Sequence, residues 1–270
     1  MKTFVSTILL SLVLFSSVCA EEEVTETYTD ASAPAHDQQV SAPSGFHGIL
    51  GAGLFSGQRI FGDEGKRTSL FPLVLMRYKD VAYWNLGGGG VWLIQTEDHS
   101  LRFGAGVRIH SGWRQGDDPG LAGMETRKSS LDGYLNALWR TALVTIGAYY
   151  YHDILNANRG DAVSLRLSKN FKMGEGLRLT PSIGAEWQNS ERVDYYYGVR
   201  PEETLAFRPA YAGTATINTN AGLAGFYRLS HSWSLLGGVF TTRYGNGIVD
   251  SPIVTRRYST LVFLGAGWRF

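Results

Sequence analysis

Long segments in which apolar and polar residues alternate with a period of two are the feature that most constrains the fold of this chain. In residues 101–112, apolar side chains at every second position alternate with Arg, Gly and His, and residues 162–171 and 177–188 follow the same pattern. Successive side chains of a β-strand point to opposite faces, so the pattern predicts strands with one apolar and one polar face. The sequence therefore predicts an all-β fold.

Most of these segments are longer than the roughly five or six residues that are usual in soluble sheets. A tilted strand needs roughly 9–11 residues to cross a bilayer, and the mature chain lacks the run of about 18 apolar residues that a spanning helix needs. The even number of segments, twelve, suits a bacterial barrel. We predict a transmembrane antiparallel up-and-down β-barrel of about 12 strands within residues 45–270. The predicted strands cover residues 45–56, 69–78, 81–87, 90–96, 99–112, 129–140, 142–153, 161–172, 176–189, 213–229, 231–245 and 257–270.

The lengths of the connections support this prediction independently. Short periplasmic turns alternate with long outer loops in outer-membrane barrels. Short links are expected at 79–80, 97–98, 141, 173–175 and 230. The other connections are expected at 57–68, 113–128, 154–160, 190–212 and 246–256, together with the glycine run 87–90. Composition agrees, because charged residues make up only 18% of the chain and Gly is abundant, with 33 residues, which disfavours a helical enzyme.

The first 44 residues differ from the rest of the chain. An apolar run that follows Lys2 and ends in Val18-Cys19-Ala20 predicts a signal peptide over residues 1–20. A lipoprotein cysteine at Cys19 is the alternative, although Ser16 replaces the leucine-like residue that lipidation requires. Residues 21–44 hold six acidic and no basic residues and are expected to form a disordered acidic leader, either a solvated spacer or a partner contact. The remaining body then has 24 basic and 18 acidic residues.

The chain ends on a strand-like pattern that finishes in an aromatic residue. Alternate apolar positions of this kind resemble the signal read by the barrel-insertion machinery, and the predicted assembly signal comprises Val262, Leu264, Trp268 and Phe270. Aromatic residues also cluster where lipid headgroups are expected, which predicts two girdles. The girdle residues are expected to be Tyr149–Tyr151 and Tyr195–Tyr197 near the long loops, and Trp139, Trp233 and Trp268 near the short turns.

The sequence gives no support for catalysis. His110 and Ser111, with Asp117 or Asp118 nearby, are the best candidates for hydrolase chemistry, but adjacent strand residues point to opposite faces and cannot pair directly. Neither hydrolase and nucleotide-binding motifs nor a multi-cysteine zinc pattern is present. We therefore expect no enzyme activity and no cofactor or metal, and the near-neutral total charge argues against a nucleic-acid partner.

The polar faces of the strands predict an interior rich in arginine. Asp132 and Glu186 are the acidic residues that the pattern also places there. Two alternatives stay open at this point: an interior with a positive potential that favours anions, or an interior filled by paired side chains and water. The residues expected to face the lumen are Arg102, Arg108, Arg166, Arg178, Glu186, Arg228 and Arg269.

Several segments of the chain match a known family. They are Tyr-Tyr-Tyr-Gly-Val at 195–199, Gly-Phe-Tyr-Arg-Leu at 225–229, Asp-Ser-Pro-Ile-Val at 250–254 and Gly-Ala-Gly-Trp-Arg-Phe at 265–270. On these residues the chain resembles the MipA/OmpV family of outer-membrane barrels, also called MltA-interacting proteins. The resemblance implies a non-enzymatic scaffold in the cell outer membrane of a Gram-negative bacterium.

The same resemblance implies two murein partners, a lytic transglycosylase and a peptidoglycan synthase. Outer-membrane lipid and the barrel-insertion machinery are further partners that any such barrel requires. The alternative function is a small anion-preferring, porin-like pore that uses the inward arginines.

Overall fold

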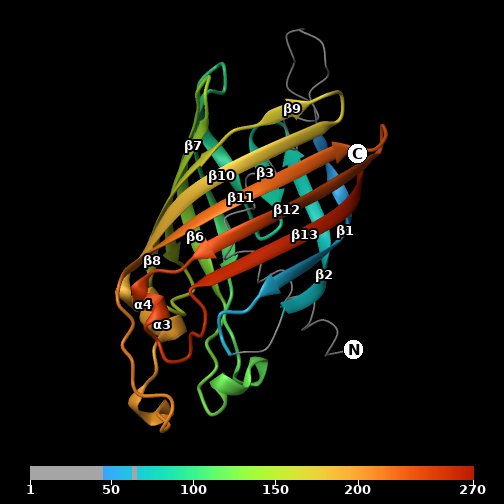
Figure 1. Ribbon diagram of the computed structural model, residues 1–270. Coiled ribbons are helices and arrows are strands. Elements are labelled where there is room, and N and C mark those ends of the chain that lie inside the picture. The colour runs from blue at the N-terminus through green and yellow to red at the C-terminus, as the bar shows by residue number, and fades with distance from the viewer. Residues whose placement is uncertain (1–44, 63–65) are drawn as a thin grey trace.

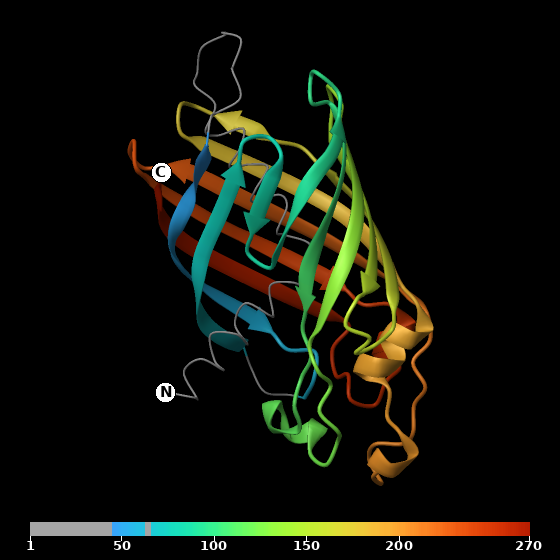
Figure 2. The same cartoon turned by 180° about the vertical axis from the view of Figure 1, so that it is seen from behind.

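The computed structural model describes residues 45–62 and 66–270. The predicted signal peptide, residues 1–20, and the predicted leader, residues 21–44, lie outside the described residues, and both stay predictions. The chain forms a slanted barrel of antiparallel strands, and its C-terminus lies at the end of the barrel away from the two α-helices (Figure 1, Figure 2).

Twelve strands close the barrel. Apart from β8 and β9, each strand pairs with its neighbours in the sequence, and β13 returns to pair with β1, so the sheet closes on itself. Two segments, β8 and β9, both pair with β10 and act as one interrupted strand. The predicted all-β, twelve-stranded up-and-down barrel is confirmed. The strands are β1 (Phe46–Gln58), β2 (Lys66–Tyr78), β3 (Ala82–Asn85), β4 (Gly88–Gln95), β5 (Leu101–His110), β6 (Ser130–Arg140), β7 (Thr145–Asp153), β8 (Asp161–Ser168), β9 (Phe171–Met173), β10 (Leu177–Gln188), β11 (Thr216–Arg228), β12 (Trp233–Arg243) and β13 (Tyr258–Arg269).

The strand boundaries depart from the predicted ones mainly around the glycine run. Gly88 to Gly90 were expected to belong largely to a connection, but all three lie in β4 and pair with β3, and the turn is Leu86–Gly87 instead. Glycine is favoured here because an added Cβ on Gly88 would lie 2.1 Å from the Val107 carbonyl oxygen of the neighbouring strand. A glycine-rich stretch can therefore mark a close approach of two backbones as well as a turn.

The alternating residues lie on two different faces of the sheet. Large apolar side chains such as Leu54 and Leu264 are 52% and 64% exposed on the outer face, as a lipid-facing surface requires. Their neighbours point inward, where one half of the interior is apolar and the other half is polar. The apolar half is a buried cluster from β1, β2 and β11–β13 that includes Phe55, Phe71 and Phe263.

The barrel has a periplasmic end and an outer end. The turns 79–81, 96–100, 141–144 and 229–232 lie at the same end as the start of β1 and the C-terminal residue Phe270, and the short-turn rule makes this end periplasmic. The longer connections lie at the outer end, where they contain α3 (Ser190–Tyr197), α4 (Asn246–Val249) and the 3-10 turns η1 (Gln115–Asp117), η2 (Pro119–Leu121) and η3 (Pro201–Glu203). Among the described residues, every helix is too short or too polar to cross a membrane.

The aromatic girdles are only partly as predicted. Trp139, Trp233 and Trp268 are exposed near the short turns, and Tyr150 is exposed near the outer end. The remaining predicted girdle residues are not lipid-facing. Tyr149 and Tyr151 are buried because the period of two turns them inward, and the triplet Tyr195–Tyr197 forms the last turn of α3.

Candidate functional site

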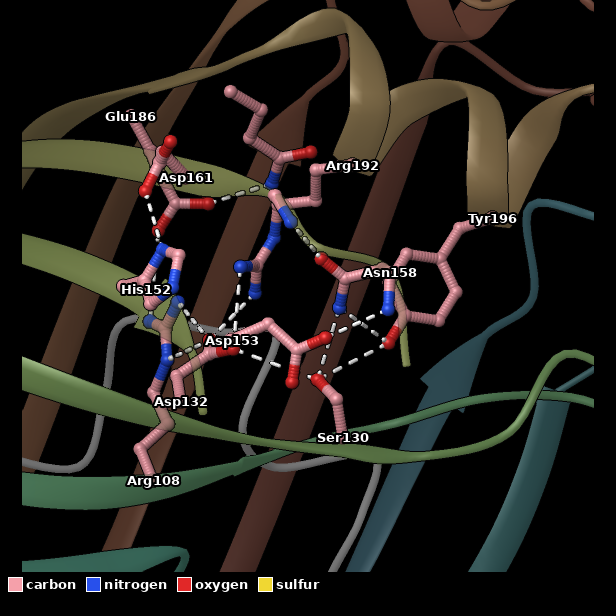
Figure 3. A network of polar contacts seen from close by, with 12 residues as sticks. Arg108, Ser130, Asp132, His152, Asp153, Asn158, Asp161, Glu186, Arg192 and Tyr196 are labelled. Atoms are coloured by element: carbon pink, nitrogen blue, oxygen red, sulfur yellow. Dashed lines mark hydrogen bonds and ion pairs between the residues drawn. The ribbon is translucent and has the colours of Figure 1, made fainter. Parts of the chain in front are cut away.

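The most highly organised polar site lies at the outer end, where α3 meets the interior ends of the strands (Figure 3). This helix begins where β10 ends, because the Asn189 side chain accepts a hydrogen bond from the Arg192 backbone N–H at 3.1 Å and caps the first turn. The cap fixes the direction of the helix. Arg192, which lies in that first turn, is completely buried.

The side chain of Arg192 forms an ion pair with Asp132 of β6. Its Nη2 lies 2.6 Å from Asp132 Oδ2 and its Nη1 lies 3.2 Å from Oδ1, a two-pronged contact. Asp132 also accepts hydrogen bonds from Nε and Nη2 of Arg108, each at 3.3 Å. One carboxylate of the barrel wall therefore joins a wall arginine to an arginine of the outer loop.

A second carboxylate balances the charge of this cluster. Glu186 of β10 lies 3.5 Å from Arg108 Nη1 and accepts a hydrogen bond from Gln188 at 2.7 Å. The Arg108 guanidinium also lies 3.4 Å from the centre of the Tyr151 ring. Two arginines thus face two carboxylates across the interior, and a buried charge is tolerated only when it is paired in this way.

Neutral side chains continue the contact between α3 and the barrel. Asn158 Nδ2 donates to Ser130 Oγ at 3.0 Å and to Tyr196 Oη at 3.2 Å, and the Tyr196 hydroxyl donates to the same serine. Burial raises the pKa of Tyr196 to about 12, so its hydroxyl stays a donor. We call Arg108, Ser130, Asp132, Asn158, Glu186, Arg192 and Tyr196 the mouth network.

Above the mouth network, the outer loops share an apolar core of their own. Residues from four connections are buried against one another although they are far apart in the sequence. We call this assembly, formed by segments 111–129, 189–215 and 244–257 with Ile60 and Phe61, the loop cap. The buried residues of the loop cap are Ile60, Trp113, Leu121, Met124, Val193, Val199, Ile248, Ile253 and Val254.

Polar contacts hold the loops of the loop cap together. Arg127 makes two hydrogen bonds to the Glu203 carboxylate, at 2.7 and 2.9 Å, and Arg208 donates to the carbonyl oxygens of Gly120 and Ala122. Burial raises the pKa of Glu203, but hydrogen bonds from Arg127 and from two backbone N–H groups outweigh it and lower that pKa to about 2. The 189–215 loop is thereby fixed to the 111–129 loop.

Comparison with known proteins agrees with this barrel. A family model described as "MltA-interacting protein MipA" matches residues 50–270. The chain belongs to this family. The MltA-interacting protein of Escherichia coli (strain K12) is 25% identical over 229 residues, which cover 82% of this chain and 89% of that relative.

Other relatives are named for their location. Outer membrane protein Omp26La of Vibrio anguillarum is 31% identical over 150 residues, which cover 56% of this chain and 58% of the relative, so the match spans little more than half of that relative's length. Among solved structures, a Pseudomonas aeruginosa FadL homologue aligns with a TM-score of 0.42 at 9% identity, over 83% of this chain and 90% of that one. This MipA family member is an outer-membrane β-barrel of a Gram-negative bacterium.

The interior residues expected from the sequence lie in different places. Arg108 and Glu186 belong to the mouth network, whereas Arg102 is buried on β5 with its guanidinium 5.5 Å from the Trp92 ring. The others lie toward the periplasmic end and are partly exposed; they are Arg166, Arg178, Arg228 and Arg269. The barrel thus brings two of the seven together at one site.

The remaining predicted residues are those of the assembly signal and those considered for hydrolase chemistry. Val262, Leu264, Trp268 and Phe270 lie along the outer face of the last strand and its end, and their role as an assembly signal stays a prediction. His110 packs against the Tyr196 ring, with 4.6 Å between ring centres, whereas Asp117 and Asp118 cap the turns η1 and η2. The contacts of these three residues are thus a ring contact and two turn caps. No group of three His, Cys, Asp or Glu residues in the described part of the chain could hold a metal ion.

Arg192 is the functional residue that sequence reasoning missed. The sequence pattern places it in the long connection 190–212, and its partner Asp132 lies 60 positions earlier in the chain. The available signal was local: Asn189 followed by Ser-Glu-Arg is a helix start with an acidic first turn.

Proposed function

We propose that this family member is a non-enzymatic outer-membrane scaffold that joins a lytic transglycosylase, a murein hydrolase, to a murein synthase. Support comes first from membership in a family whose model is named for interaction with MltA. The relative from E. coli carries the same name. A scaffold needs a body fixed in the membrane, which the closed barrel supplies.

The observation that carries the proposal is the loop cap. Four connections pack into a buried apolar core at the outer end, and Arg192 ties this core to the barrel wall. The interior of a porin is a polar, water-filled channel, whereas these loops bury apolar side chains against one another. The outer end is therefore built for rigidity, which suits an anchor better than a conduit.

The test is affinity capture from detergent-solubilised outer membranes, with the murein enzymes identified by mass spectrometry. We expect a lytic transglycosylase to be retained together with a murein synthase. The matched control is Arg192→Ala, which loosens the outer end and should leave capture unchanged, because a murein enzyme reaches the barrel from the periplasm. Absence of every murein enzyme from the captured material would contradict the proposal.

The alternative function, a small anion-preferring pore, is supported by the arginines of the interior. Arg108, however, faces two carboxylates in the mouth network, so at the outer end the positive potential is largely cancelled. Ion selectivity measured under a salt gradient separates the two functions, because only a pore gives discrete anion-selective currents.

A further inference from the structure

The wall of the barrel is incomplete on one side of β2. All 13 residues of this strand pair with β1, whereas the four-residue strand β3 pairs with it only at Met76, Arg77 and Tyr78. Among the described strands, none except β1 and β3 pairs with β2. The β3–β4 hairpin is shorter than β2 and β5 on either side of it (Figure 2). Residues 68–74, in the outer half of the wall, therefore have an unpaired side, which we call the open edge.

The short hairpin ends at a fixed position. Leu86, in its turn, is 2% exposed and belongs to the same buried cluster as Leu73 and Leu75 of β2. Gly87, the second turn residue, accepts a hydrogen bond from the backbone N–H of Ile109 at 2.9 Å. Packing on one side and β5 on the other thus keep the hairpin from extending along the open edge.

The register of the sheet shows which backbone groups face the open edge. Lys79 donates its backbone N–H to Gly45, just before β1. Bonded and non-bonded pairs alternate along an antiparallel ladder, so the odd-numbered residues of β2 bond to β1 and the even-numbered ones point away. At positions 76 and 78 they face β3. The even-numbered residues that face no described strand are Thr68, Leu70, Pro72 and Val74.

Proline occupies one of these four positions. Pro72 has no backbone N–H, and within sheets proline is confined to edges and bulges because it cannot donate to a ladder. An N–H at this position would have pointed to the open edge, so the ladder between Pro72 and β1 loses no hydrogen bond. The sequence and the register therefore agree that β2 is an edge strand at this height.

The open edge lies at the level of the lipid. Leu70 is 68% exposed on the outer face of the barrel, beside Leu54 at 52%. Hydrocarbon offers no hydrogen bonds, and lipid-exposed open sheet edges do not occur within that region. The three N–H groups and four carbonyl oxygens of the open edge therefore require a partner with both donors and acceptors, which a lipid acyl chain does not have.

We propose that the open edge binds an extended, uncharged segment of another membrane protein, which adds a strand to the barrel wall beside β2. A strand offers donors and acceptors at the spacing of the open edge, and about seven residues, or about 23 Å, match its length. The outward side chains of the added strand face lipid beside Leu70, and the inward ones meet Phe71 and Leu73 of the buried apolar cluster. Unpaired charges are costly in both surroundings, so the segment carries none.

A second copy of this chain fits the open edge less well. Two copies paired through this edge would bring two prolines into one ladder, and two carbonyl oxygens would lack donors. A segment without proline offers a donor to each carbonyl. The added strand lies in the outer half of the membrane, so this interaction is separate from the proposed scaffold function, in which murein enzymes approach from the periplasm.

The test uses the purified full chain in detergent micelles and a synthetic peptide of about eight alternating Val and Thr residues, enough to cover the open edge. The matched control peptide has the same sequence with every backbone amide N-methylated, which keeps the side chains but removes every donor. The readout is hydrogen exchange, followed by NMR, of the backbone amides of Leu70 and Val74. Ser69 and Leu73, which bond to β1, are internal references.

We expect the unmodified peptide to slow exchange at Leu70 and Val74 about tenfold, of the order that one backbone hydrogen bond contributes, and to leave the references unchanged. The N-methylated peptide should change none of the four. Equal effects of the two peptides would overturn the proposal, because apolar contact alone would then explain binding. Protection of Leu70 and Val74 without peptide, together with a dimer in chemical cross-linking, would overturn it in favour of a second copy.

Substitution of Leu70 gives an independent check. Leu70→Pro removes one N–H from the open edge but no hydrogen bond to β1, so we expect the affinity for the unmodified peptide to fall about tenfold. Leu70→Ala, the matched control, keeps the N–H and should bind like the parent chain; equal affinities of the two variants would contradict the proposal. Heat-modifiable gel mobility verifies folding, and if Leu70→Pro does not fold, the two peptides on the parent chain decide. Failure to capture murein enzymes has no bearing on this result.

Discussion

A buried carboxylate with two guanidinium partners responds differently to the loss of each one. Asp132 is held by Arg108 from the barrel wall and by Arg192 from the loop, and only the second contact connects two separate parts of the chain. Loss of Arg192 leaves Asp132 paired with the wall, so the barrel can stay intact while the loop is released.

We predict that Arg192→Ala reduces the free energy that holds segment 189–215 in place by about 3 kcal/mol, the lower end of the range for breaking a buried pair. Hydrogen exchange of residues 193–215 in detergent micelles measures this loss. The control is Arg200→Ala, which removes an exposed ion pair with Glu125 and should change protection by less than about 1 kcal/mol. Equal effects of the two substitutions would show that the buried ion pair of Arg192 does not hold segment 189–215 more strongly than an exposed pair does.

Glu203 makes the loop cap sensitive to acid. Its pKa lies below the ordinary value of 4.5, at about 2, so its contribution to stability is complete above pH 4.5 and is lost as the pH falls toward 2. We expect exchange protection of the 199–211 segment to decline across this window while the barrel strands stay protected. Glu203→Gln should start with lower protection and show a smaller decline; an identical pH profile for the variant contradicts the assignment.

At the scale of elements, closure of the barrel depends on glycines where β1 meets β13. A Cβ on Gly51 would lie 2.0 Å from the Ala266 carbonyl oxygen and 2.5 Å from Gly267 Cα. Because both neighbours are backbone atoms, the strands would have to separate. Gly225 of β11 is different, since its Cβ would meet a methyl group of Leu179 at 3.4 Å and the Gly237 carbonyl oxygen at 3.7 Å, both ordinary contact distances.

We predict that Gly51→Ala destabilises the folded barrel by about 3 kcal/mol, the upper end of the usual range for overpacking. Gly225→Ala, at an ordinary contact distance, should stay within about 1 kcal/mol of the parent chain. Urea titration of the folded fraction, followed by heat-modifiable gel mobility, compares the two. A tolerated Gly51→Ala would mean that the β1–β13 seam is looser than these distances indicate.

The strands were predictable from the sequence because their signal is local. A period of two depends only on which side of the sheet is wet, and over ten or more residues it located the long strands; the short strands β3 and β4 are where the boundaries departed. The girdle prediction was wrong for Tyr149 and Tyr151. It treated three consecutive tyrosines as one lipid-facing group, although alternation turns the first and third of them inward. Helix α3 was missed because three consecutive tyrosines do not favour a helix by propensity.

At the scale of the whole molecule, the loop cap was beyond sequence reasoning. Its core brings together Ile60, Trp113, Val193 and Ile248, which are separated by many strands, and nothing in the local sequence pairs them. The sequence predicted an interior rich in arginine and left its potential open, and it could not tell that Arg108 is balanced by carboxylates at the outer end. Fold was therefore readable from periodicity, whereas the site required knowledge of long-range contacts.

The central proposal is that the loop cap, whose apolar core is buried at the outer end, makes this protein an anchor and not a conduit. Current across a planar lipid bilayer containing the purified intact chain tests this most directly. We predict no discrete conductance steps under an applied voltage at neutral pH. Reproducible single-channel steps with a preference for anions would contradict the account and favour the pore.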